Sequence, residues 1–143
     1  MAQEPSIRIR GKAEYTSGWI GRFNVVELHY PRQKRVTDWE GGYFPLTMHF
    51  DEDYPNKPPI CKFPANFVHV NVYDTGAVCL SILGDAWSPS ITVQQILLCI
   101  QELLDNPNPA SSVQRFYYHL FTKKCPEYKN RVRQQAKLYP PPV

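Results

Sequence analysis

The sequence predicts an α+β fold: an antiparallel meander sheet of three to four strands packed against a long central helix, followed by C-terminal helices. Runs rich in β-forming residues fill the first half of the chain, and runs with apolar residues at helical spacing fill the second half. Size is the third observation, because 143 residues with 43% hydrophobic content are enough for about one domain with its own core.

Three strands are predicted in chain order. Residues 23–30 are rich in β-formers and end at a proline and a basic turn. Residues 43–50 alternate, which predicts a half-buried antiparallel strand, and Pro45 on the other face predicts that this strand lies near an edge or begins irregularly. A proline-rich turn leads to the third run, residues 60–63. The apolar face of the second strand consists of Phe44, Leu46, Met48 and Phe50.

The long helix has clear start and stop signals. Thr92 and Gln95 form a capping-box pattern, T-x-x-Q, which predicts the first turn. Asn106 and Pro107 predict the end. The apolar residues that follow at helical spacing, and should face the sheet, are Val93, Ile96, Leu97, Ile100, Leu103 and Leu104.

Two further helices are predicted. The second begins at Ser111 or Ser112, and the third begins at Pro126, since proline is favoured in the first turn. The second helix is expected to bury Val113, Phe116, Tyr117 and Leu120. The third is expected to carry Val132 and Ala136, and a basic outer face of Lys129, Arg131, Arg133 and Lys137.

Between the sheet and the long helix, residues 64–89 hold no period for long. An irregular segment of ~25 residues inside a compact domain is uncommon and often functional, so it is the first place to look for chemistry. It contains Cys79, one of four cysteines. Because the cysteines form no CxxC pair and no zinc-type spacing with the histidines, we expect neither a metal site nor a disulfide framework. The other cysteines are Cys61, Cys99 and Cys125.

The surroundings of Cys79 favour a thioester carrier over a cysteine hydrolase. A hydrolase needs a base within hydrogen-bond reach of its thiol, and His69 lies ten residues upstream. A carrier only exchanges one thioester for another, which needs little activation. Asp74 and Asp85 nearby oppose thiolate formation. On the residues alone, a purely structural cysteine stays open, and so does a hydrolase built on His69 and Cys79.

Charge and hydropathy limit the classes of partner that the chain is expected to bind. The net charge of +3 comes from basic clusters near the N-terminus (Arg8, Arg10, Lys12), in residues 32–35, and after Lys123. These clusters are either a solvated surface or a docking patch for an acidic partner. No basic–aromatic repeat or zinc knuckle indicates nucleic-acid binding. No apolar run is long enough to span a membrane, and the first residues lack the apolar centre of a secretory signal, so we expect a soluble intracellular protein.

Several motifs in the same order resemble the ubiquitin-conjugating enzyme family. His69-Val70-Asn71, then seven residues, then Cys79 resembles the H-P-N motif and the active-site cysteine of that family. The resemblance covers roughly residues 39–137, about two-thirds of the chain. The other motifs are Trp39-Glu40-Gly41-Gly42, Asp53-Tyr54-Pro55 with Pro58-Pro59, Trp87-Ser88-Pro89, and the stretch from Ile96-Leu97-Leu98 to Pro107-Asn108. Val78 to Leu83 and Arg131 to Lys137 are more similar to the SUMO-conjugating members than to the ubiquitin-specific ones.

The resemblance implies a role for each of four residues. Cys79 holds the carboxyl end of the modifier as a thioester. Asn71 donates a side-chain hydrogen bond that supports the active-site loop and the developing oxyanion. Tyr73 and Ser111 shape the slot for the incoming lysine, whose amine must lose its proton to react.

The resemblance also implies the partners. They are a ubiquitin-like modifier (SUMO), a modifier-activating enzyme, ligases, and protein substrates with acceptor lysines. It implies no cofactor and no metal. We expect a monomer of the nucleus and cytoplasm that binds no nucleic acid and no membrane.

Three departures from the family leave alternatives open. Val70 replaces the proline of the motif, so its loop has more backbone entropy to lose. Ser111 replaces an aspartate of the SUMO-conjugating enzymes. Residues 1–18 have no helical apolar period, so the helix that docks the activating enzyme is predicted to be missing or replaced there, and we expect a disordered segment. We therefore divide the chain into an atypical segment, residues 1–18, and a catalytic core, residues 19–143. The alternatives are a weak or inactive binding module on the same scaffold and a conjugating enzyme for ubiquitin.

Overall fold

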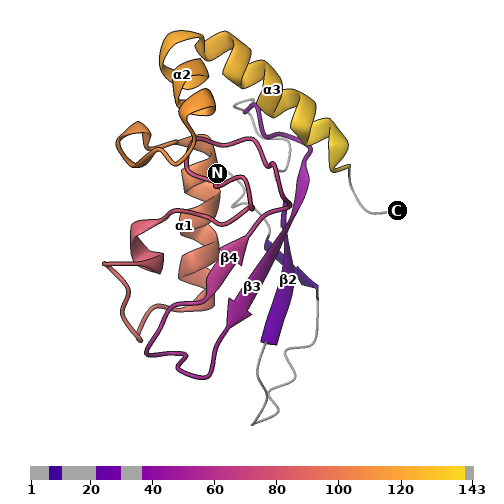
Figure 1. The fold of residues 1–143 in the computed structure, drawn as a ribbon. Helices are drawn as coiled ribbons and strands as arrows, with labels where there is room; N and C mark the ends of the chain where they lie inside the picture. The colour runs from indigo at the N-terminus through magenta and orange to yellow at the C-terminus, as the bar shows by residue number, and fades with distance from the viewer. Residues whose placement is uncertain (1–6, 11–21, 30–36, 141–143) are drawn as a thin grey trace, which may run out of the picture.

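The computed structural model describes residues 7–10, 22–29 and 37–140, with side chains from residue 37 onward. In these described residues, the chain forms a sheet and three α-helices (Figure 1). The strands are β1 (Ile7–Arg10), β2 (Arg22–His29), β3 (Tyr43–Phe50) and β4 (Ile60–Lys62). The α-helices are α1 (Val93–Asp105), α2 (Arg115–Lys123) and α3 (Cys125–Leu138), with short 3-10 turns η1 (Ser81–Leu83) and η2 (Pro109–Ser111). The predicted α+β class, with an antiparallel sheet and helices after it, is confirmed.

The sheet has the order β1-β2-β3-β4, and all neighbours are antiparallel. β3 therefore lies between β2 and β4, so the expectation of an edge position is wrong for the strand as a whole. The reason that Pro45 is tolerated is local. β4 is only three residues long and pairs with Thr47, Met48 and His49, so it ends before it reaches Pro45.

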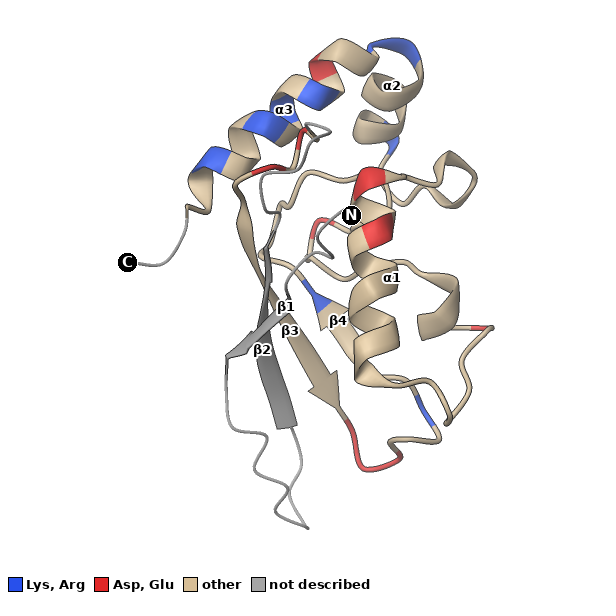
Figure 2. Ribbon diagram, turned by 180° about the vertical axis from the view of Figure 1, so that it is seen from behind, with Lys and Arg blue, Asp and Glu red and all other residues tan. Residues whose placement is uncertain are grey.

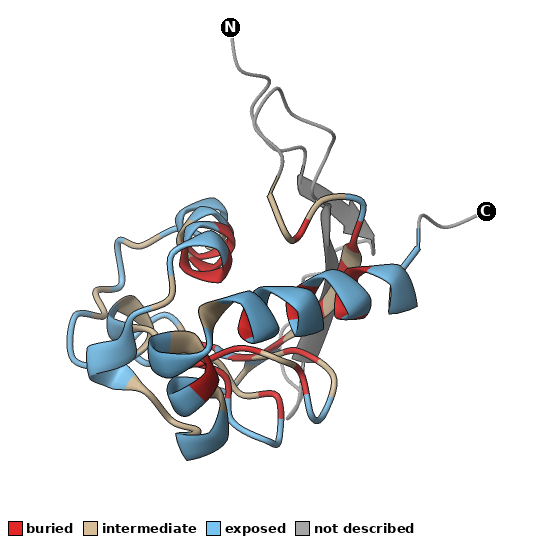
Figure 3. Cartoon of the chain, turned by 90° about the horizontal axis from the view of Figure 1, so that it is seen from above, coloured by how far each residue is buried: buried red, intermediate tan, exposed pale blue. Residues whose placement is uncertain are grey.

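The core joins the sheet to α1 and α3. Phe44, Leu46 and Met48 of β3 are fully buried, as their alternation predicted. An aromatic cluster closes one end of this core: Trp39 stacks on Phe67 with ring centroids 5.8 Å apart, and Phe67 stacks on Phe63 at 4.2 Å. Seen from above, the buried residues of α1 and α3 face the interior and their exposed residues face outward (Figure 3).

Helix α1 forms as its sequence predicts. Thr92 caps it, and the capping box with Gln95 is present in both directions, at 3.2 and 2.8 Å. The helix ends at Asp105 with Asn106 as its C-cap. Its buried apolar residues are Ile96, Leu97, Ile100, Leu103 and Leu104, while Val93 is only half-buried.

Helix α2 begins later than predicted. It starts at Arg115 rather than Ser111 or Ser112, because η2 and an extended stretch occupy the preceding residues. That stretch is held extended by the Val113 N–H, which donates to the Val70 carbonyl at 3.1 Å. The predicted apolar face is also wrong in part, since Leu120 is buried but Phe116 is 53% exposed. Val113 and Tyr117 are half-buried.

Helix α3 begins at Cys125, one residue before the predicted Pro126. Val132 and Ala136 are buried, as predicted. The predicted basic face is exposed and follows the outer side of the helix (Figure 2). It consists of Lys129, Arg131, Arg133 and Lys137.

The structure describes only part of the N-terminal segment, residues 1–18. Within residues 1–18, Ile7–Arg10 form β1 and pair with β2, and the other residues of that segment lie outside the described ones. The division at residue 18 therefore stays a prediction. No helix in the described part of the chain is long and apolar enough to cross a membrane.

Candidate active site

The segment between β4 and α1 is irregular, as predicted, with η1 as its only helical turn among the described residues. A tight hairpin organises its centre. The Tyr73 N–H donates to the Ala77 carbonyl, and the Gly76 N–H donates to the Tyr73 carbonyl, both at 2.9 Å. Gly76 has a φ of +93°, and a Cβ there would lie 1.9 Å from the Phe63 carbonyl oxygen. Only glycine fits this turn, which returns the chain toward its own start.

The hairpin brings Cys79 back beside Asn71. The Cys79 N–H donates to the Asn71 carbonyl at 2.8 Å, although eight positions separate them in sequence. The Cys79 side chain is half-buried, so it has a route to solvent. Cys61 differs sharply, because burial raises the pKa of its thiol to about 12 and makes it unreactive.

His69 is a structural residue. It is fully buried, and burial lowers its pKa to about 4, against the opposing effect of hydrogen bonds to the Leu103 and Leu104 backbone. Its Nδ1 accepts the Asn71 N–H at 3.0 Å, so Nε2 carries the proton and donates to the Leu103 carbonyl at 2.9 Å. With both ring nitrogens occupied, His69 has no free nitrogen to act as a base for Cys79. The hydrolase alternative loses its base.

Asn71 is buried and its side chain spans two loops. Its NH2 group donates to the Asn108 carbonyl at 2.7 Å and to the Ser111 carbonyl at 2.9 Å. Its Oδ1 accepts the Asn108 N–H at 2.8 Å. The side chain therefore fixes η2, and with it Ser111, against the segment that carries Cys79.

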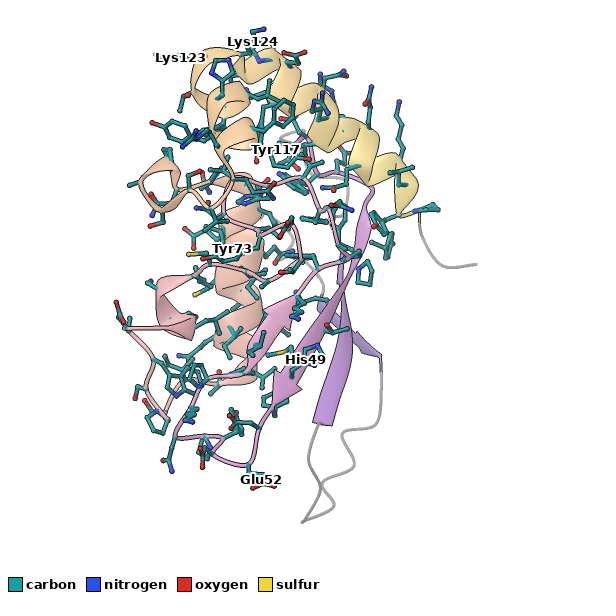
Figure 4. The ribbon with its side chains drawn as sticks, in the orientation of Figure 1. His49, Glu52, Tyr73, Tyr117, Lys123 and Lys124 are labelled. Carbon is teal, nitrogen blue, oxygen red and sulfur yellow. The ribbon has the colours of Figure 1, made fainter. Side chains whose placement is uncertain are left out.

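The four predicted site residues lie around this hairpin, but they are held differently. Hydrogen bonds link Cys79, Asn71 and Ser111, while Tyr73 is placed by the hairpin backbone and is 45% exposed (Figure 4). Ser111 is exposed at the end of η2. Two exposed side chains near a half-buried thiol can line a path for an incoming group.

Val70 does not loosen its loop. The valine is fully buried, its N–H donates to the Tyr128 hydroxyl at 3.4 Å, and its carbonyl accepts the Val113 N–H at 3.1 Å. Both backbone groups are therefore paired. A proline at this position would lack the N–H that Tyr128 accepts.

The sequence did not reveal the residues that hold the segment from outside. Gln114 donates to the Val72 carbonyl, and Gln135 bonds both backbone groups of Val68. One signal was available for α3. Tyr128 and Gln135 share the spacing of the buried Val132 and Ala136, and polar atoms on a buried face need partners. No group of three potential metal ligands is present in the part of the chain that the structure describes.

Together, the α+β fold and a half-buried cysteine that His69 cannot serve as a base fit a protein that carries an acyl group better than one that hydrolyses it. Comparisons with known proteins agree. The model of the ubiquitin-conjugating enzyme family matches residues 22–136, and the chain belongs to that family. It is 62% identical to the SUMO-conjugating enzyme SCE1 of Arabidopsis thaliana over 131 residues, which cover 90% of this chain and 82% of that protein. It is 55% identical to the Sumo-conjugating enzyme ubc9 of Dictyostelium discoideum over 111 residues, or 76% and 70% of the two chains.

Proposed function

We propose that the chain is a SUMO-conjugating enzyme that accepts SUMO as a thioester on Cys79 and transfers it to lysines of other proteins. The observation that carries the proposal is a half-buried thiol fixed beside Asn71, while the nearby His69 has both ring nitrogens in other hydrogen bonds. The high identity to two SUMO-conjugating enzymes supports SUMO as the cargo.

The reaction needs two exchanges at one carbonyl. First the Cys79 sulfur replaces the thiol of the activating enzyme, so one thioester forms as another breaks. Then the amine of a substrate lysine attacks the same carbonyl, and Cys79 leaves as a thiolate while an isopeptide bond forms. The amine gives up a proton to solvent in this step, because His69 has no free nitrogen to receive it.

Three side chains assist the second exchange. Tyr73 and Ser111 line the approach and partly desolvate the lysine, which favours its neutral, reactive form. Asn71 holds η2 in place and, in the reacting complex, turns an N–H from one of its two carbonyl partners toward the oxyanion.

The wider setting follows from the same function. The strands β2 to β4, α1 and the C-terminal helices belong to the proposed catalytic core, residues 19–143, and β1 extends the same sheet from the segment before it. The enzyme acts as a monomer in the nucleus and cytoplasm. It receives SUMO from an activating enzyme and works with ligases.

A charging assay tests the proposal. The protein is mixed with the SUMO-activating enzyme, ATP and SUMO, and in parallel with the ubiquitin-activating enzyme and ubiquitin. A SUMO adduct that a reductant removes is expected, and Cys79→Ser should replace it with an adduct that the reductant leaves intact. Cys61→Ser is the matched control and should charge like the wild type. Charging with ubiquitin alone would show that SUMO is the wrong cargo. No adduct with either modifier would leave only the alternative of an inactive binding module.

A further inference from the structure

Helix α3 holds the start of the active-site segment through the side chain of Gln135, which pairs with the backbone of Val68 as a neighbouring strand would. The Val68 N–H donates to Gln135 Oε1 at 2.7 Å, and Gln135 Nε2 donates to the Val68 carbonyl at 3.2 Å. Gln135 is only 6% exposed, so water does not compete for these bonds. One buried side chain therefore satisfies both backbone groups of a residue 67 positions away.

A second side chain of α3 reaches the same segment two residues later. The Tyr128 hydroxyl accepts the Val70 N–H at 3.4 Å, and Tyr128 is 3% exposed. Burial raises the pKa of Tyr128, so the hydroxyl is neutral across the working pH range. This contact exists only because position 70 carries an N–H, which the proline of the family motif would lack.

The two contacts lead directly to the catalytic thiol. Val70 is followed by Asn71, and the Asn71 carbonyl holds the Cys79 N–H at 2.8 Å. On the C-terminal side of Cys79, the backbone hydrogen bonds from η1 to Trp87 are local, and one side-chain bond, from the Trp87 indole N–H to the Pro55 carbonyl at 3.0 Å, reaches further. The backbone of Cys79 is held on its N-terminal side, through Asn71 and through the Val78 N–H, which donates to the Cys61 carbonyl at 3.0 Å, so the placement of the sulfur depends on that side. A shift of the segment toward or away from α3 would move Cys79 and Asn71 together.

We propose that Gln135 and Tyr128 are positioning residues for the transfer of the modifier. The hydrogen bond to the Tyr128 hydroxyl fixes the backbone of Val70, as the ring of a proline would fix it at the same position. The inference rests on the proposed function, because it concerns the second exchange at Cys79. Both residues act through the backbone and touch neither modifier nor lysine. Charging tolerates a small displacement of the thiol, since thiol exchange needs little alignment, whereas aminolysis also needs Asn71 and the lysine slot in register.

The test separates charging from transfer in Tyr128→Phe and Gln135→Met. Each variant is charged with SUMO, the charging is stopped, and the thioester is discharged to a range of lysine-peptide concentrations. We expect the maximal discharge rate to fall roughly three- to tenfold for Tyr128→Phe and further for Gln135→Met, with charging and the KM for the peptide unchanged. Tyr117→Phe and Gln134→Met, close neighbours on α2 and α3, are the matched controls and should behave like the wild type.

A double-variant cycle with Val70→Pro gives a readout that a merely structural role would not move. In the proline background no N–H faces the hydroxyl, so Tyr128→Phe should leave the discharge rate unchanged there. Equal losses in the valine and proline backgrounds would overturn the role of the Tyr128 hydroxyl. Melting temperatures of the wild type, the two single variants and the double variant identify any protein that unfolds. If one of them unfolds, the discharge rates of the folded single variants decide whether the Tyr128 hydroxyl has a positioning role.

The outcomes also separate this inference from the proposed function. If the wild type does not charge, the proposed function fails. If the wild type charges and discharges but both α3 variants discharge at its rate, the function stands and the positioning role is overturned. A rise in KM with an unchanged maximal rate would place Gln135 or Tyr128 in peptide binding and would also overturn it.

Discussion

The two halves of the active-site segment both lack α-helix and regular strand, and only the outer one contains a 3-10 turn, η1, but they are held in opposite ways. The inner half, residues 68–72, is fully buried from His69 onward, and residues 34 to 67 positions away bond to it. The outer half, residues 80–86, is half-buried or exposed. Its bonds are local: the Leu83 N–H donates to the Leu80 carbonyl, and those of Gly84 and Ala86 donate to the Ser81 carbonyl, at 2.9 to 3.0 Å.

This difference shows that a segment without helix or strand is rigid where distant parts of the chain satisfy its backbone groups. Cys79 lies between the two halves and is tied to the inner one through Asn71. The inner half therefore places the sulfur, and the outer half leaves room around it. Changes in the inner half should lower transfer or stability strongly, and changes in the outer half should be tolerated.

The largest expected effect is that of Asn71→Ala. It removes three hydrogen bonds to Asn108 and Ser111 as well as the proposed oxyanion donor. Discharge of the charged enzyme to lysine should slow by roughly 10²–10³, the loss typical of one oxyanion donor. Single-turnover discharge measures it, with Asn56→Ala in the exposed loop before β4 as the control. A loss below about fivefold would mean that the inner half does not control transfer.

Acid should destabilise the protein through His69. Its pKa is lowered to about 4 from 6.5, so the unfolded chain takes up a proton first as the pH falls. This contribution is fully present above pH 6.5 and is lost as the pH falls from 6.5 to about 4, by up to about 3 kcal/mol at 1.36 kcal/mol per unit. Urea unfolding across that range should show a shallower pH slope in His69→Gln. His119→Gln, exposed on α2, should keep the wild-type slope, and equal slopes in both variants would contradict the prediction.

Two glycines sharpen the contrast between fixed and free backbone. Gly76, in the hairpin, has a φ of +93° and no space for a Cβ beside the Phe63 carbonyl, so Gly76→Ala should cost about 2 kcal/mol or more in unfolding free energy. Gly84, in the outer half, has a φ of −140°, and a Cβ there would lie 3.9 Å from the Ser81 carbonyl oxygen. Gly84→Ala should therefore cost clearly less than Gly76→Ala, because the added Cβ meets nothing closer than an ordinary van der Waals contact. Chemical denaturation of the two variants measures the difference, and equal losses would mean that the outer half is as constrained as the hairpin.

The sequence was informative where structure is set locally. The Thr92 capping box, the alternation in β3 and the isolation of Cys79 from any near histidine could all be read from neighbouring residues. What it could not predict depends on long-range pairing. α2 begins late because the residues before it bond to the inner half, as in the Val113 contact to Val70. The roles of Gln135 and Tyr128 likewise appear only when α3 is packed against a segment more than 50 residues earlier.

The smallest expected effect concerns Ser111, which the inner half holds through its backbone while its side chain faces solvent. An aspartate there would add a negative charge beside the path of a positively charged lysine. Exposed ion pairs contribute about 0.2–1 kcal/mol, so Ser111→Asp should lower the KM for a lysine peptide by roughly two- to fivefold and weaken that gain at high salt. The maximal rate should hardly change, because the same carboxylate also favours the protonated amine. Ser90→Asp, exposed before α1, is the charge-matched control, and an equal fall in its KM would show that net charge, not the position of Ser111 beside Asn71, attracts the peptide.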